Sequence, residues 1–232
     1  MKMKTRKRVA SALLFLLFVI AQAVLFPLIQ LTPGDVSASA SYLSIIVVAL
    51  FVIIACKCRG ADHLVRLGLL LTLVADYFLV LSDDKQIEGV AAFAVVQLCY
   101  CFYLIAKEER LYLCVINTLT RIILAGVLIA CAFVVLGADT DALSLISVIY
   151  YANLVTNMIF AFALGKGNRI FAIGLVLFAM CDLCIGLEIL ATEYLDSDVF
   201  AFFYGENINL PWVFYQPSQV LIALSLFKGK QK

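Results

Sequence analysis

The chain has 232 residues, of which 65% are hydrophobic and only 14% are charged, and its formal net charge is +1. Water could not solvate a chain of this composition as one globule, so the composition excludes a soluble protein and indicates an integral membrane protein. The near-zero net charge also argues against a nucleic-acid partner.

Runs of about 17–25 apolar residues predict membrane-spanning helices. We expect an all-α, polytopic bundle of eight transmembrane helices, because the chain has eight such runs. The segments between them are short, so residues 1–232 should form a single transmembrane domain. The predicted spans are residues 9–31, 39–56, 64–82, 88–106, 116–137, 142–164, 169–191 and 207–227.

The first predicted span has a second interpretation. The basic start "MKMKTRKR", an apolar stretch and the small residues of "SASAS" are also typical of a cleaved signal peptide. The apolar stretch is longer than the usual core of such a peptide, so we favour a retained helix. Cleavage would leave seven helices.

The fifth predicted span has a polar start. Asn117, Thr118, Thr120 and Arg121 interrupt the apolar pattern there. This start also fits a short interfacial segment, followed by a span that begins near Arg121.

The positions of the basic residues test the eight-span topology, because Lys and Arg collect in cytoplasmic segments. With both termini cytoplasmic, every Lys and Arg except Lys85 falls on the inner side. An odd number of helices would destroy this alternation, so the pattern favours eight spans in a multi-pass protein of the cell membrane. The outer segments carry acidic residues instead: Asp35, Asp83, Asp84, Glu88, Asp139, Asp141, Glu193, Asp196, Asp198 and Glu206.

The eight cysteines fall in predicted helices or near the inner side, which does not favour a disulfide framework. The spacing of Cys181 and Cys184 is also seen in redox and zinc motifs. A second pair at metal-site spacing is missing, and His63 is the only histidine. We therefore interpret the cysteines as small packing residues and expect neither a metal nor a cofactor.

Two aspartates lie inside the predicted spans, where an ionised Asp costs about 2.5–3.5 kcal/mol. Asp76 follows Arg66 by ten residues, about 15 Å of helix, and Asp182 follows Arg169 by thirteen, about 20 Å. In a hydrocarbon layer about 30 Å thick, both carboxyl groups lie between the midplane and the outer surface. We therefore expect them to meet.

Two carboxyl groups that meet in a medium of low dielectric constant share one proton, so one can serve as an acid and the other as a base. Lys and Arg are missing from the same spans, apart from Arg121 near the inner side, so a structural ion pair is disfavoured. Other polar residues recur three or four positions apart and so share helix faces, although each set also fits a contact between packed helices. These are Gln97 and Tyr100; Tyr150, Asn153 and Asn157; and Trp212, Tyr215 and Gln219.

Four segments between residues 64 and 226 resemble, in order, the YhhN-type lysoplasmalogenase family. They are "ADYFLVLSDDKQIEGVAAFAVVQLCYCFYL", "SVIYYANLVTNMIFAFAL", "IGLVLFAMCDLCIGL" and "WVFYQPSQVLIALS". The positions that carry the resemblance are Ala75, Asp76, Gly89, Phe93, Gln97, Tyr100, Tyr150, Met158, Gly174, Phe178, Cys181, Asp182, Tyr215 and Gln219.

The resemblance implies hydrolysis of the vinyl ether bond of lysoplasmalogens, a class of lysophospholipid, to a fatty aldehyde and a glycerophospho-base. Gln97 stands where the family usually has His, and Cys181 where it usually has Ser; Gln carries no proton, so an acid–base role of that His does not transfer. Asp76 and Asp182 are the predicted catalytic pair. Gln97, Tyr100, Tyr150, Asn153, Tyr215 and Gln219 are the predicted substrate-binding residues.

Two alternatives are open at this point. A proton- or cation-coupled transporter would use the same buried carboxyl groups, although the four prolines do not recur in matching halves. The segments around Asp76 and Asp182 also allow a parallel duplication of four helices. A purely structural or scaffolding membrane protein would have no use for two unpaired aspartates inside the membrane, so we disfavour that function. Headgroup preference and oligomeric state are not determined by the sequence.

Overall fold

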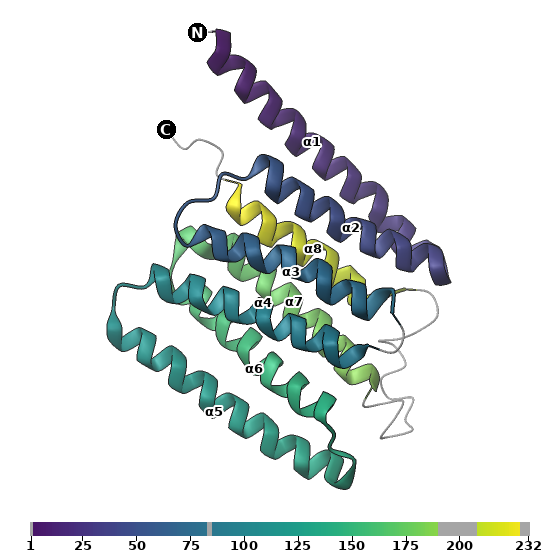
Figure 1. Cartoon of the computed structure of the whole chain (residues 1–232), viewed down its shortest axis with the longest axis vertical. Coiled ribbons are helices and arrows are strands. Elements are labelled where there is room, and N and C mark those ends of the chain that lie inside the picture. Colours follow the sequence, from purple (N-terminus) through teal and green to yellow (C-terminus); the bar gives the residue numbers. More distant parts are fainter. Residues whose placement is uncertain (1, 83–84, 190–207, 228–232) are drawn as a thin grey trace.

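The computed structural model describes residues 2–82, 85–189 and 208–227. These residues are helical apart from their connections, and consecutive helices run in opposite directions (Figure 1). The helices are α1 (Lys2–Leu31), α2 (Gly34–Ala55), α3 (Asp62–Val80), α4 (Gln86–Lys107), α5 (Leu111–Leu136), α6 (Ala142–Ala163), α7 (Arg169–Ile189) and α8 (Leu210–Leu226), with short 3₁₀ turns η1 (Gly137–Asp139) and η2 (Lys166–Asn168).

Within the described residues, seven helices, α1 to α7, are long and apolar enough to cross a membrane. The eighth helix, α8, has 17 residues, which extend over about 25 Å. The chain is therefore a multi-pass helical membrane bundle. Eight spans with both termini on the inner side stay a prediction.

Glycines with positive φ lie at the ends of two helices, and a capping aspartate lies at the start of one. Gly137 has φ 56° and ends α5, and Gly165 has φ 84° and follows α6. Only glycine adopts this left-handed region without a steric penalty. Asp141 then caps α6 by accepting a hydrogen bond from the backbone N–H of Ser144 at 2.8 Å.

Three helices begin well before the predicted spans, and one of them, α1, begins at Lys2 rather than at residue 9. Helix α2 begins at Gly34 rather than at residue 39. Helix α5 is continuous from Leu111, so the alternative of a separate interfacial segment before Arg121 is wrong. Its polar side chains bond within the bundle, so they do not break the helix. Parts of the seventh and eighth predicted spans, 190–191 and 207, lie outside the described residues, as do the acidic residues Asp83, Asp84, Glu193, Asp196, Asp198 and Glu206.

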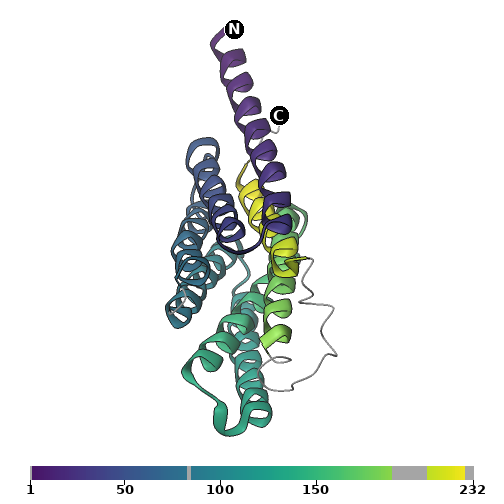
Figure 2. The ribbon, with the colours of Figure 1, turned by 90° about the vertical axis from the view of Figure 1, so that its right-hand side faces the viewer.

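Helices far apart in the sequence form the centre of the bundle. The most extensive pairings are α3 with α4 and α7 with α8, while α4 also packs on α6 and α8 on both α2 and α3. Helix α1, packed on α2 and α8, and helix α5, packed on α6, lie at opposite edges (Figures 1 and 2). The buried apolar core therefore lies among α2, α3, α4, α6, α7 and α8.

Polar bonds secure α1 to this core. Gln22 donates through Nε2 to the carbonyl of Ser44 on α2 at 3.0 Å, and Gln216 on α8 donates to Gln22 Oε1 at 2.6 Å. All three side chains are buried. In apolar surroundings such bonds fix helix positions, because an unsatisfied amide would be costly.

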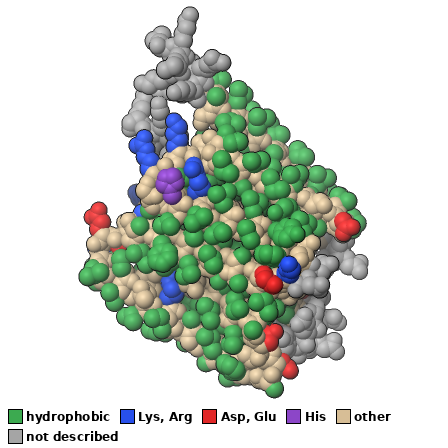
Figure 3. All heavy atoms as spheres, in the orientation of Figure 1, with side chains coloured by type: hydrophobic (Ala, Val, Ile, Leu, Met, Phe, Trp, Pro, Cys, Tyr) green, Lys and Arg blue, Asp and Glu red, His purple; other side chains and the backbone are tan. Residues whose placement is uncertain are grey.

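The surface matches a lipid environment. Figure 3 shows a face that is mostly hydrophobic, with basic side chains gathered near His63 at one of its ends. At this same end, a salt bridge of 3.3 Å joins Lys107 on α4 to Asp62 on α3, and Lys107 also donates to the Tyr103 hydroxyl at 2.8 Å. The ends of α3 and α4 are therefore fixed to each other.

Candidate active site

The first intramembrane carboxyl group belongs to α3. Asp76 lies one turn beyond Thr72 on the buried face of this helix, and its exposed fraction is 3%. The hydroxyl of Tyr215, on α8, donates to Asp76 Oδ2 at 2.7 Å. A carboxyl group in the core is thus held by a phenol from a helix 139 positions further along the chain.

The second carboxyl group has a corresponding partner. Asp182 on α7 is half-buried, and the hydroxyl of Tyr150 on α6 donates to Asp182 Oδ2 at 2.5 Å. Both tyrosines are buried. Each intramembrane aspartate therefore has one phenol donor from a different helix.

The two Asp–Tyr pairs share an aromatic wall. The Phe93 ring lies 6.0 Å from the Tyr150 ring and 6.2 Å from the Tyr215 ring, between centroids. Phe178 lies 5.3 Å from Tyr215 and 6.5 Å from Tyr150. The tyrosines that hold Asp76 and Asp182 thus lie against the same two aromatic rings, where α3, α4, α6, α7 and α8 meet.

Cys181 also lies at this site. Its side chain is buried, and it directly precedes Asp182 on α7. A neutral thiol is only a weak hydrogen-bond donor. The tyrosines therefore supply the strong hydrogen bonds here.

Tyr100 and Gln219 are both buried, and the Tyr100 ring packs on Phe171 at 5.3 Å between centroids. The Tyr100 hydroxyl has no hydrogen-bond partner among the described residues, and its ring lies over Gly68, where a Cβ would come 2.4 Å from Tyr100 Cε1. Gln219 follows Tyr215 by one turn of α8, and its Oε1 is also unpaired. Both therefore retain hydrogen-bonding capacity for a bound molecule.

The structure places Gln97 and Asn153 in a different cluster. Asn153 Oδ1 accepts from Arg121 Nη1 at 2.6 Å, and Gln97 Oε1 accepts from Asn157 Nδ2 at 2.9 Å. Neither bonds to an aspartate among the described contacts. That both bind substrate stays a prediction, but their side chains bond to Arg121 and Asn157.

Arg121 was expected near the inner side and outside the site. It lies ten residues beyond Leu111, about 15 Å along α5. The signal in the sequence is the four-residue spacing of Asn117 and Arg121, and of Asn153 and Asn157. Residues four apart share a helix face, so each pair can act on one partner.

Metal-ligating side chains do not gather at the aspartates. In the described part of the chain, no three His, Cys, Asp or Glu side chains are close enough to hold a metal ion. The site therefore offers carboxyl, phenol and amide groups for proton transfer and hydrogen bonding.

A family model matches residues 36–226, which include both aspartates, both tyrosines and the aromatic wall. The chain belongs to the YhhN family. The resemblance noted in the sequence is thereby confirmed, and the match extends from α2 to the end of α8 in this YhhN protein. Neither a curated protein nor a solved structure matches the chain.

Proposed function

We propose that this YhhN-family protein hydrolyses the vinyl ether bond of lysoplasmalogens in the cell membrane, releasing a fatty aldehyde and a glycerophospho-base. The observation that carries the proposal is the pair of intramembrane aspartates, each held by a tyrosine from a separate helix. The resemblance to lysoplasmalogenases supplies the substrate class.

The reaction requires an acid and a base. A protonated carboxyl group transfers its proton to the vinyl carbon that does not bear the oxygen, which leaves a positive charge shared by the other vinyl carbon and the ether oxygen. The ionised carboxylate accepts a proton from water as that water adds to the charged carbon. The two carboxyl groups then exchange roles: the one that is now protonated gives its proton to the departing glyceryl oxygen, and the other takes the proton of the hemiacetal hydroxyl. One water is consumed, an aldehyde and an alcohol are formed, and both carboxyl groups return to their starting states.

The surrounding residues suit these steps. The hydroxyls of Tyr150 and Tyr215 orient the carboxyl groups, which must face the substrate within hydrogen-bonding reach. The faces of Phe93 and Phe178 provide an apolar wall next to the developing cation, and aromatic faces attract positive charge. The hydrocarbon chain of the substrate would pack against apolar helix surfaces.

The test is aldehyde release by purified protein from choline and ethanolamine lysoplasmalogens. Asp76→Asn and Asp182→Asn keep the shape of each side chain but remove its acid–base chemistry, so each variant should lose activity while remaining folded. Glu188→Gln is the matched control, because it removes another carboxyl group from α7. Full aldehyde release by either Asp variant would refute the assignment.

A transport assay separates the main alternative. Wild-type protein in proteoliposomes is tested for proton and Na⁺ uptake alongside aldehyde release. Uptake that is lost in Asp76→Asn, without aldehyde release by the wild type, would identify a carrier and not a hydrolase.

A further inference from the structure

Arg121 is a cation in the middle of a membrane helix with only neutral partners. Its Nη1 donates to Asn153 Oδ1 at 2.6 Å, and its Nη2 donates to Asn117 Oδ1 at 2.9 Å and Asn157 Oδ1 at 3.0 Å. Among the described residues, no carboxylate forms a salt bridge with it. Its positive charge is therefore solvated by amides but not neutralised.

The same cluster contains unused donors. Gln97 is completely buried, and its Nε2 has no hydrogen-bond partner, because only its Oε1 is engaged, by Asn157. The Nε of Arg121 is also buried and unpaired. A fixed positive charge with two free N–H donors is suited to an oxyanion such as a phosphate, which accepts charge-assisted hydrogen bonds.

The distance from this cluster to the tyrosine that holds Asp182 matches the distance from the vinyl ether to the phosphate in a lysoplasmalogen. Phe93 is one turn from Gln97 on α4, and on α6 Tyr150 precedes Asn153 by three residues and Asn157 by seven. The amides thus lie about 4.5–10.5 Å along the helix axis from the tyrosine that holds Asp182. In a lysoplasmalogen, five bonds separate the vinyl ether oxygen from phosphorus, a reach of about 6 Å at roughly 1.5 Å per single bond.

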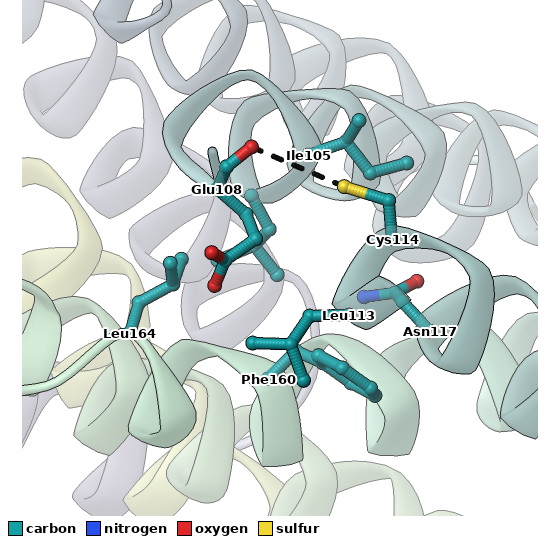
Figure 4. A pocket seen from close by; sticks show the side chains of 8 residues that line it. Ile105, Glu108, Leu113, Cys114, Asn117, Phe160 and Leu164 are labelled. Atoms are coloured by element: carbon teal, nitrogen blue, oxygen red, sulfur yellow. Dashed lines mark hydrogen bonds between the residues drawn. The ribbon is translucent and has the colours of Figure 1, made fainter. Parts of the chain in front are cut away.

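A pocket borders this cluster at Asn117. Figure 4 shows Asn117, whose Oδ1 accepts from Arg121, on one side of the pocket and Glu108 on another. Arg110 binds the Glu108 carboxylate at 2.8 and 3.0 Å. The remaining walls come from the end of α4, the start of α5 and the end of α6. Their residues are Leu104, Ile105, Leu113, Cys114, Phe160 and Leu164.

We propose that Arg121 and the Nε2 of Gln97 bind the phosphate of the lysophospholipid, and that the rest of the headgroup points through this pocket to the inner side. The inference rests on the proposed function for the identity of the lipid. A clamp that merely fixes α5 to α6 would not require free donors or an unneutralised charge.

The test is binding of two saturated ether lipids with the same chain, 1-O-alkyl-glycerophosphocholine and 1-O-alkylglycerol, to the purified full-length protein. Neither contains a vinyl ether, so binding is measured without hydrolysis. The wild type should bind the phosphate-bearing lipid at least tenfold more tightly. Arg121→Gln should abolish this preference and leave alkylglycerol binding unchanged. Arg66→Gln should keep it, because Arg66 is likewise half-buried and donates to backbone carbonyls, those of Val52 and Cys56.

Each other outcome is decisive. A preserved preference in Arg121→Gln, or an equal loss of binding for both lipids, overturns the phosphate site. If Arg121→Gln does not fold, the test is made with Arg121→Lys, which keeps the positive charge but lacks the planar guanidinium group. A preference for the phosphate-bearing lipid that falls at least threefold supports the site. An unchanged preference overturns it. Displacement of the phosphocholine lipid by millimolar inorganic phosphate would indicate a site for free phosphate and overturn the lipid assignment.

The same experiment separates this site from the proposed reaction. A wild-type protein that prefers the phosphate-bearing lipid but releases no aldehyde from lysoplasmalogen would support the Arg121 site and refute the hydrolase. Aldehyde release without any preference would support the hydrolase and overturn the site.

Discussion

Removal of the Tyr150 or the Tyr215 hydroxyl can show which of the two aspartates is ionised and which is protonated. Replacement of either tyrosine by Phe removes one hydroxyl and keeps the ring, whose packing against Phe93 and Phe178 is unchanged. The bonds that disappear are 2.5 Å long at Asp182 and 2.7 Å long at Asp76. Each substitution therefore tests a single contact.

The expected losses depend on the protonation state of each aspartate. A hydrogen bond to an ionised group contributes about 1.5–3 kcal/mol, and one between neutral groups about 0.5–1.5 kcal/mol. If one carboxyl group is protonated and the other ionised, one variant should therefore lose about twice as much stability as the other. The variant with the larger loss identifies the ionised aspartate, which is the base.

Thermal unfolding in detergent measures the stability, and kcat/KM for aldehyde release measures the function. A lost contribution of about 1.4 kcal/mol to the transition state lowers the rate about tenfold, so Tyr150→Phe and Tyr215→Phe should each lose about tenfold or more. Equal losses of stability would contradict a pair that shares one proton. Unchanged kcat/KM in both variants would refute a catalytic role for the tyrosine-held carboxyl groups.

Three further predictions concern stability. Gly174→Ala should lower the free energy of unfolding by about 1–3 kcal/mol, because a Cβ there would lie 2.7 Å from a side-chain carbon of α8, whereas Gly186→Ala meets no atom within 4 Å and should have little effect on thermal unfolding. Gln22→Leu should lower the melting temperature, because the Gln22 side chain loses its bonds to α2 and α8; an unchanged value would show that these side-chain bonds do not hold α1. The hydrogen bonds from Ser144 lower the pKa of Asp141 below its ordinary 3.8, so the cap stabilises α6 above that pH and is lost as the pH falls through the lower folded value. Asp141→Ala should therefore lower the melting temperature at pH 7, and this difference should shrink as the pH falls below 3.8; a difference that does not shrink in acid would contradict this cause.

The positions of the helices could be predicted from the sequence, because the length of an apolar run is a property of one segment. The boundaries were less accurate where polar residues begin a helix. Asn117 and Arg121 looked like an interruption of α5, yet they bond to each other at 2.9 Å and to α6. A polar residue breaks a membrane helix only when it lacks partners, and partners on other helices are not visible in one segment.

The composition of the candidate site was predictable in part. Intramembrane carboxyl groups are costly, so Asp76 and Asp182 stood out, and the structure gives each a tyrosine from the predicted set. The hydrogen-bond partner of Asn153 could not be predicted from the sequence. It lies about 60° around the helix from Tyr150, which is enough to direct it toward Arg121 on α5.

The bond between Asp76 and Tyr215 also has a consequence for biosynthesis. The two residues are 139 positions apart, so at about 5–20 residues per second the ribosome needs roughly 10–30 s between them. During that interval α3 is in the bilayer while the phenol that binds its carboxyl group does not yet exist. The pair of Asp76 and Tyr215 can therefore form only after α8 has been made.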